Sequence, residues 1–139
     1  MKLTDKIDEL KKDNKKLLLV IGQPGSGKSK LLREYSEETG HPIVDVDKLF
    51  AHVPTDQILK EMKDFLSNYH HEVLLLDRKN LIVNSDIDLL EFLKELSQHV
   101  YIVTTWNGKV EDGQLFHFNK TNDDLIYPVD QDTFSYILC

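Results

Sequence analysis

The sequence contains very little cysteine and no long apolar run. Its one cysteine, Cys139, excludes a disulfide within the chain and a zinc site built from several cysteines. No stretch approaches the roughly 20 apolar residues that a membrane-spanning helix needs. The first residues, Met1-Lys-Leu-Thr-Asp-Lys, carry mixed charge instead of the apolar centre of a secretory signal. We therefore expect a cytoplasmic protein that has no contact with a membrane.

Arginine is scarce as well, and positive charge is outweighed. Arg33 and Arg78 are the only arginines, and 24 acidic residues against 17 Lys and Arg give a net charge of −7. Because such a chain repels the phosphate backbone of nucleic acids, we expect no direct nucleic-acid binding by the chain alone. Arginine is the residue that usually stabilises a transferring phosphoryl group, so its scarcity leaves few candidates for that role.

What the sequence does contain is an alternation of apolar strand and helix patterns. The unbroken apolar run over residues 17–21 is typical of a strand buried on both faces of a parallel sheet. Further strands are predicted over residues 42–47, 73–77 and 100–106. Helices are predicted around residues 3–10, over 28–40 with Gly40 as C-cap, over 58–69 behind Thr55 as cap, and over 85–96 with a capping-box-like start at Ser85.

This alternation predicts one α/β domain over residues 1–139, with a three-layer, P-loop NTPase-like parallel sheet and helices on both faces. The pattern changes after residue 106. Asn107-Gly108 and Asp112-Gly113 are turn pairs, residues 115–118 form a short strand pattern, and residues 125–129 are extended around Pro128. We expect this minimal core to end in a short β-rich, hairpin-like tail.

The segment Gly22-Gln-Pro-Gly-Ser-Gly-Lys28-Ser29 has the P-loop spacing and lies between a predicted buried strand and a predicted helix. In that context, loop amides and the positive end of the helix can converge on phosphate oxygens. Lys28 would reach the β- and γ-phosphates, and the Ser29 hydroxyl would hold Mg²⁺. The predicted nucleotide-binding residues are Gly22, Gln23, Pro24, Gly25, Ser26, Gly27, Lys28, Ser29 and Lys30.

Two further strand ends carry candidate catalytic residues. Asp77 closes the predicted strand over residues 73–77, so its carboxylate would be the second anchor for Mg²⁺ at the sheet edge where ligands bind. Thr105, at the end of the strand over residues 100–106, could place a hydroxyl beside the γ-phosphate as a sensor. The competing interpretation is that Asn107-Gly108 forms a hairpin turn there. Lys28, Asp77 and Thr105 are the predicted catalytic set.

The group that would activate water is left open by the sequence. Many related ATPases have a glutamate immediately after the strand-end aspartate, but Arg78 occupies that position here. The base would therefore be Asp45 or Asp47, a residue from a partner, or absent. Asp45 and Asp47 are better explained as strand-end or helix-capping residues.

The chain resembles the BrxF family of small P-loop proteins from BREX phage-defence systems, particularly those of the third type. The resemblance covers most of the chain. It depends on the short N-terminal helix, the glycine-rich loop, the Leu-Leu-Asp77 strand end, Thr105-Trp-Asn-Gly108 and Tyr127-Pro128. It implies a minimal ATPase-like core that acts beside other BREX components, among them a large ATPase, an alkaline-phosphatase-like protein and a DNA methyltransferase. Members of the family often have an acidic residue near the position of Asn80, and this departure puts autonomous hydrolysis in question.

The leading hypothesis is an ATP-binding subunit that uses ATP and Mg²⁺ and has weak activity until it assembles with itself or with partner proteins. A homo-oligomer and contact with other BREX components are both open. No Asn-Lys-x-Asp segment for reading guanine is present, which favours ATP. A small-molecule kinase is the first alternative, although the stretch from Lys109 to Asn122 lacks the arginines of a typical lid. A scaffold that binds ATP without hydrolysing it is the second alternative.

Overall fold

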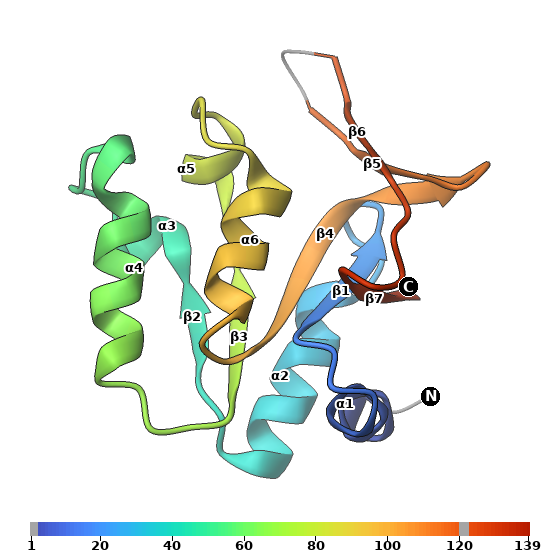
Figure 1. Cartoon of the computed structure of the whole chain (residues 1–139), viewed down its shortest axis with the longest axis horizontal. Coiled ribbons are helices and arrows are strands. Elements are labelled where there is room, and N and C mark those ends of the chain that lie inside the picture. Colours follow the sequence, from blue (N-terminus) through green and yellow to red (C-terminus); the bar gives the residue numbers. More distant parts are fainter. Residues whose placement is uncertain (1–2, 120–122) are drawn as a thin grey trace.

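A computed structural model describes residues 3–119 and 123–139 and has an α/β fold built on a parallel sheet (Figure 1). Within the described part, five strands pair in the order β2-β3-β4-β1-β7, and each neighbouring pair is parallel. The bounds of these strands are β1 (Leu17–Gly22), β2 (Ile43–Asp45), β3 (Val73–Asp77), β4 (Tyr101–Glu111) and β7 (Ser135–Leu138). The α/β class and the parallel sheet predicted from the sequence are thus confirmed.

Strand β1 lies inside the sheet and is buried on both faces. Leu17, Leu19 and Ile21 belong to one apolar cluster, whereas Leu18 and Val20 belong to the other. Successive side chains of a strand point to opposite faces, so an unbroken apolar run supplies both layers of core. The first predicted strand is therefore confirmed, together with its burial.

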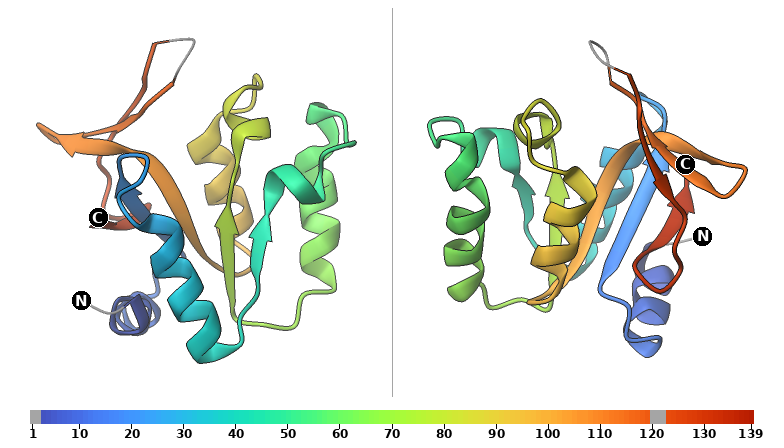
Figure 2. Two further views of the ribbon diagram at one scale, coloured as in Figure 1. Left: turned by 180° about the vertical axis from the view of Figure 1, so that it is seen from behind. Right: turned by 45° about the horizontal axis from the view of Figure 1, so that its top comes forward.

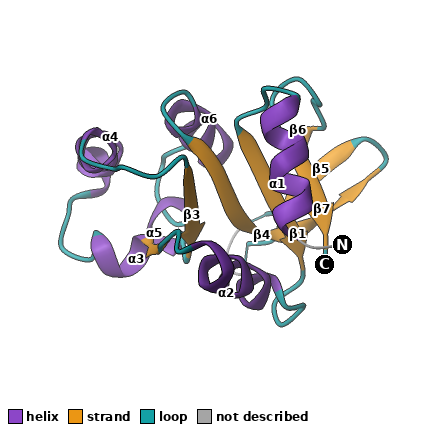
Figure 3. Ribbon diagram, turned by 90° about the horizontal axis from the view of Figure 1, so that it is seen from below, coloured by secondary structure: helices purple, strands orange, loops and turns teal. Residues whose placement is uncertain are grey.

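Helices cover both faces of the sheet. α1 (Leu3–Lys12) and α2 (Lys28–Thr39) pack on the face that includes Leu18 and Val20. The opposite face is covered by α3 (Val46–Leu49), α4 (Ile58–Ser67), α5 (Asn80–Val83) and α6 (Leu89–Ser97), with the short 3-10 turn Thr55–Gln57 before α4. Figure 3 shows α2 on one side of the sheet and α4 and α6 on the other. Within the described ranges, no helix is long and apolar enough to cross a membrane.

Helix ends agree only in part with the capping predictions. Gly40 has φ 78 and its amide donates to Ser36 O at 2.8 Å, which confirms it as the C-cap of α2. The cap of α6 is Asp88, whose carboxylate accepts from Glu91 N at 3.0 Å, so the predicted start at Ser85 is wrong. Thr55 makes no side-chain cap, because the chain enters α4 through the 3-10 turn.

Two predicted strand boundaries are also wrong. Strand β2 stops at Asp45, which caps α3 by accepting from Lys48 N at 3.0 Å, so residues 46 and 47 belong to a helix. Strand β4 runs through Asn107-Gly108 without turning. A Cβ at Gly108 would collide with Phe116 O and lie 2.9 Å from Trp106 Nε1. Gly108 thus permits a close approach of two strands, and the same Asn-Gly pair that is typical of a turn serves packing here.

The predicted β-rich tail is confirmed as an antiparallel extension of β4. Asp112 and Gly113, with φ 51 and 74, form the turn from β4 into β5 (Gln114–His117), which pairs with β6 (Leu125–Pro128). Figures 1 and 2 show β5 and β6 projecting beyond the main sheet. After β6 the chain returns so that β7 pairs with β1. The sequence patterns did not predict β7.

Candidate functional site

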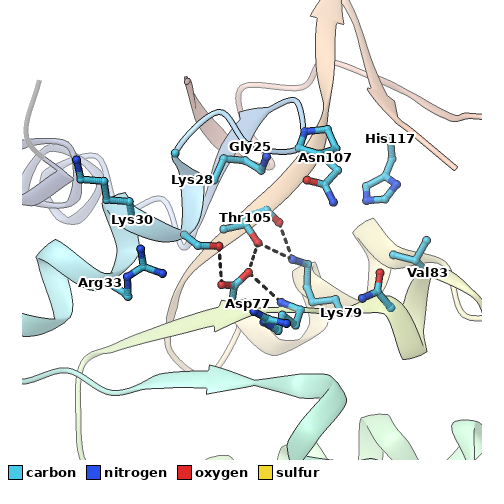
Figure 4. Close-up of a pocket in the computed structure, with 15 residues that line it drawn as sticks. Gly25, Lys28, Lys30, Arg33, Asp77, Lys79, Val83, Thr105, Asn107 and His117 are labelled. Carbon is cyan, nitrogen blue, oxygen red and sulfur yellow. Dashed lines mark hydrogen bonds between the residues drawn. The ribbon is translucent and has the colours of Figure 1, made fainter. Parts of the chain in front are cut away.

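A cavity of about 400 Å³ lies at the carboxyl ends of the parallel strands (Figure 4). Ligands bind at this edge in open α/β sheets, because loops and helix N-termini converge there. The cavity is lined by Pro24, Gly25, Gly27, Lys28, Ser29, Lys30, Arg33, Asp77, Arg78, Lys79, Asn80, Val83, Thr105, Asn107 and His117. Among the described residues that line the cavity, Asp77 is the only carboxylate, against five lysines and arginines. The cavity is therefore basic within an acidic chain.

The glycine-rich loop joins the end of β1 to the first residue of α2 and lines one side of the cavity. Gly25 and Gly27 adopt φ 83 and 98, the left-handed region that residues with a side chain rarely enter. Six of the nine predicted binding residues line the cavity. Gly22, Gln23 and Ser26 do not line it and instead shape the loop; a Cβ at Gly22 would collide with Ser26 Oγ.

Lys28 is buried, with 6% of its surface exposed. Its ammonium donates to Gln23 O at 2.7 Å and lies 3.5 Å from Ser26 Oγ. Burial lowers the pKa of Lys28, because the charged form loses hydration. Among the described residues, no carboxylate lies within 4.0 Å of this ammonium. The lysine therefore holds the loop together through neutral oxygens and makes no close ion pair, while charges at Cys139 and Asp77 act on it from a greater distance.

Ser29, Asp77 and Thr105 meet through hydrogen bonds, although they are 48 and 28 positions apart along the chain. Ser29 Oγ donates to Asp77 Oδ2 at 2.9 Å, and Thr105 Oγ1 donates to Asp77 Oδ1 at 2.9 Å. The amide of Arg78 also donates to Asp77 Oδ1, at 2.9 Å. The structure thus brings together the predicted pair of metal ligands and the predicted sensor hydroxyl, with the carboxylate held by donors on both of its oxygens.

Lys79 is a site residue that the sequence interpretation missed. It is 6% exposed, and its ammonium donates to Thr105 O at 2.6 Å and to Thr105 Oγ1 at 3.3 Å. Burial lowers the pKa of Lys79 to about 8, despite the opposing effect of the charges on Asp77 and Asp47. The sequence feature that could have indicated Lys79 is its place two positions after the strand-ending Asp77. Spacing alone, however, does not show that its side chain turns toward the cavity.

Asp45 and Asp47 do not line the cavity. Asp45 caps α3, and Asp47 accepts hydrogen bonds at the start of α5 from Leu81 N at 2.8 Å, Asn80 N at 3.2 Å and Asn80 Nδ2 at 2.9 Å. These bonds satisfy amides that a helix leaves free at its first turn. The capping interpretation of both residues is confirmed, and neither is among the residues that line the cavity.

Two further residues line the cavity where β4 continues into the extension. Asn107 lies exposed on β4, and His117 is buried on β5 with its ring edge-on to Trp106 at 4.9 Å between centroids. Burial, together with the nearby charge of Lys79, lowers the pKa of His117 to about 4. His117 is therefore neutral near pH 7. Asn107 and His117 thus contribute neutral polar groups to the cavity wall.

Ser29 and Asp77 also meet a chemical requirement of Mg²⁺, which prefers hard oxygen ligands and keeps several waters or substrate oxygens. Nowhere in residues 3–119 and 123–139 do three or more His, Cys, Asp or Glu side chains form a group that could hold a metal ion. A magnesium ion at this pair would therefore need oxygens from water or from a bound substrate to complete its shell.

No protein-family model matches the chain, and no curated protein matches it.

Proposed function

We propose that this chain is an ATP-binding P-loop protein whose weak hydrolysis of ATP is completed by assembly. The observation that carries the proposal is the Ser29–Asp77 hydrogen bond of 2.9 Å beside a glycine-rich loop and the buried ammonium of Lys28, which makes no ion pair within 4.0 Å among the described residues. A buried charge without a counter-ion is costly unless a ligand supplies the opposite charge. A triphosphate supplies that charge, and the basic lining of the cavity favours it over neutral ligands.

The loop residues bind and orient the nucleotide. Gly25 and Gly27 let the backbone approach the phosphates closely. Helix α2 begins at Lys28, so the positive end of its dipole also favours the phosphates. Lys28 exchanges its bond to Gln23 O for phosphate oxygens, which keeps the lysine ordered in both states. The backbone at Lys30 continues the contact toward the α-phosphate.

Ser29 and Asp77 would hold Mg²⁺ in place of their mutual hydrogen bond. When bound, the ion neutralises charge on the β- and γ-phosphates. Thr105 donates a hydrogen bond to the same carboxylate. Its role is therefore to orient Asp77 and to respond as a sensor when the position of that carboxylate changes. This function goes with a more specific fold assignment, which we propose to be a minimal, three-layer P-loop NTPase.

The lining of the cavity supports weak turnover by the isolated chain. Asp77 is the only carboxylate that the described residues contribute to it, and a residue that binds Mg²⁺ is not free to accept a proton from water. Asp45 and Asp47 are used as caps. The water-activating group would therefore come from another protomer or from a partner. The same observation favours a second candidate, a scaffold that binds ATP without hydrolysing it and orders a partner surface.

We further propose that the chain acts in the cytoplasm as a subunit of a BREX-type phage-defence assembly. The support is the resemblance of its glycine-rich loop, the Thr105-Trp-Asn-Gly108 segment and Tyr127-Pro128 to the BrxF family. In the structure, Trp106 donates from Nε1 to Phe116 O at 2.9 Å and packs edge-on against Tyr127 at 5.9 Å. The Thr105-Trp-Asn-Gly108 and Tyr127-Pro128 segments therefore pack against each other. The expected partners are other BREX components, including the large ATPase, or further copies of the chain.

The test of nucleotide binding is calorimetry with Mg-ATP on the wild type and on Lys28→Ala. We expect the variant to lose at least about tenfold in affinity, because a charged contact to phosphate is worth on the order of 1.5–3 kcal/mol. Lys60→Ala, which removes an exposed lysine on α4, is the matched control and should bind as the wild type does. Unchanged affinity in a folded Lys28→Ala protein would contradict the assignment of the loop.

The two candidate functions differ in the fate of ATP. The wild type is incubated with labelled ATP and with every candidate partner, and bound nucleotide is analysed after many hours. Conversion to ADP supports the ATPase, whereas intact ATP supports the scaffold.

A further inference from the structure

Lys79 is a buried lysine that no described carboxylate contacts, although the charges of Asp77 and Asp47 act on it from beyond 4.0 Å. Its ammonium has three donors and meets two oxygens of one residue, Thr105, both of them neutral. In the described part of the chain, no carboxylate lies within 4.0 Å of it. Because buried charges in folded proteins are normally paired, a lysine that lines a cavity in this state indicates an anionic ligand beside it.

The backbone before Lys79 is held in an uncommon conformation. Arg78 has φ 53, in the left-handed region that non-glycine residues seldom adopt. Two hydrogen bonds hold it there: its amide donates to Asp77 Oδ1 at 2.9 Å, and its carbonyl accepts from Asp47 N at 2.9 Å. Strained residues that are fixed by their surroundings cluster at functional sites. Here the fixed residue lies between the strand-end carboxylate and the inward-pointing lysine.

Lys79 and Lys28 reach the same cavity from different elements. Lys28 comes from the start of α2, and Lys79 comes from the loop between β3 and α5. A chain of hydrogen bonds runs from Ser29 through Asp77 and Thr105 to Lys79 (Figure 4). In this view Lys79 lies on the opposite side of Asp77 from Arg33. Two separate ammonium groups that line one cavity fit a ligand with several negative charges.

The two arginines are less suited to this position. The side chain of Arg78 is 72% exposed, and its Nε lies 3.6 Å from Asp45 Oδ2. Arg33 is exposed on α2. Neither is desolvated as Lys79 is, and a charge excluded from water interacts more strongly with a ligand.

We propose that Lys79 binds the terminal phosphate of the nucleotide and thereby makes the chain select a nucleoside triphosphate over a diphosphate. The inference rests on the proposed function and adds a second phosphate-binding lysine to the site. When a triphosphate enters, the ammonium turns from the Thr105 carbonyl to the phosphate oxygens. A diphosphate does not extend far enough, so Lys79 stays on Thr105.

The experiment compares the affinities of Mg-ADP and of a non-hydrolysable Mg-ATP analogue for wild type, Lys79→Met and Lys79→Arg, with Lys60→Met as the control for loss of a lysine. We expect the wild type to prefer the triphosphate. In Lys79→Met the triphosphate affinity should fall at least about tenfold while the diphosphate affinity stays within about twofold. Lys79→Arg should retain part of the preference. A wild type without preference, or a Lys79→Met protein with the wild-type preference, would overturn the inference.

A crystal structure of the wild type with the triphosphate analogue gives a test that does not depend on the folding of any variant. We expect Lys79 Nζ within hydrogen-bond distance of a terminal phosphate oxygen. An ammonium that remains on Thr105, away from every phosphate, would refute the assignment. If the wild type binds neither nucleotide, the proposed function fails together with this inference. If it binds both and Lys28→Ala weakens both, a failure at Lys79 concerns this inference alone.

Discussion

At the scale of single residues, the most unusual feature is the backbone of Arg78. Its positive φ of 53 follows directly on Asp77. For a residue with a Cβ, the left-handed conformation costs roughly 1–2 kcal/mol relative to the right-handed one. The hydrogen bonds of its amide and carbonyl offset this cost. The protein therefore maintains local strain next to the residues proposed to bind magnesium and phosphate.

This strain can be measured with two substitutions at the same position. Arg78→Gly and Arg78→Ala both remove the exposed side chain and its contact with Asp45, but only glycine adopts positive φ freely. We expect Arg78→Gly to be more stable toward urea than Arg78→Ala by about 1 kcal/mol. Equal free energies of unfolding for the two variants would show that the left-handed conformation is not maintained in solution.

At the scale of elements, the long strand β4 connects the parallel sheet to the extension. Its first half pairs with β1 and β3, and its second half pairs with β5. Thr105 and Asn107 pair with β1 in the parallel sheet, whereas His117 lies on β5 in the extension and pairs with Gly108 of β4. The extension therefore positions residues at the cavity only if β4 continues through Gly108 without a turn.

Substitution of Gly108 by alanine tests this continuity. The added Cβ would collide with Phe116 O, which also accepts the Trp106 Nε1 hydrogen bond. We expect Gly108→Ala to lose about 2 kcal/mol of unfolding free energy, because a crowded site must shift its backbone to accept a methyl group. The control is Lys109→Ala, at the next and exposed position of the strand, where loss of an exposed ion pair with Glu111 and of a contact with the Phe116 ring should cost less than about 1 kcal/mol. A Gly108→Ala protein as stable as its control would argue against the observed strand pairing.

At the scale of the whole molecule, charge is distributed unevenly. The chain has a net charge of −7, but its cavity is lined by five basic side chains and one acidic one. Because like charges repel, most of the surface disfavours polyanions while the cavity attracts a small anion. This distribution fits a protein that binds nucleotides without binding nucleic acid by itself.

The described part of the chain contributes no carboxylate besides Asp77 to the cavity, which predicts that turnover depends on assembly. We expect phosphate release per chain to be low in dilute solution and to rise several-fold with concentration or with added partner, since another chain would supply the missing group. Release is measured over a dilution series, and sedimentation gives the oligomeric state at each concentration. Lys28→Ala should remain inactive throughout. High and concentration-independent turnover by the monomer would contradict this prediction.

Much of the fold follows from local patterns in the sequence. The apolar runs over residues 17–21 and 73–76 form buried strands, and Gly40 ends a helix, because these features depend on near neighbours in the chain. The meeting of Ser29 with Asp77 was also predictable, since parallel strands place their carboxyl ends at one edge. Local pattern failed at Asn107-Gly108, where the same residues suit a turn and a close strand contact.

The sequence by itself determined where the glycine-rich loop lies and which strand ends flank it, because spacing sets backbone conformation over a few residues. Tertiary structure alone decided that Lys79 turns inward, that Asp47 caps a helix distant in sequence, and that β7 completes the sheet beside β1. These outcomes depend on which surfaces lose water when segments far apart pack together. Burial and the pairing of charges arise only then, and no local pattern records them.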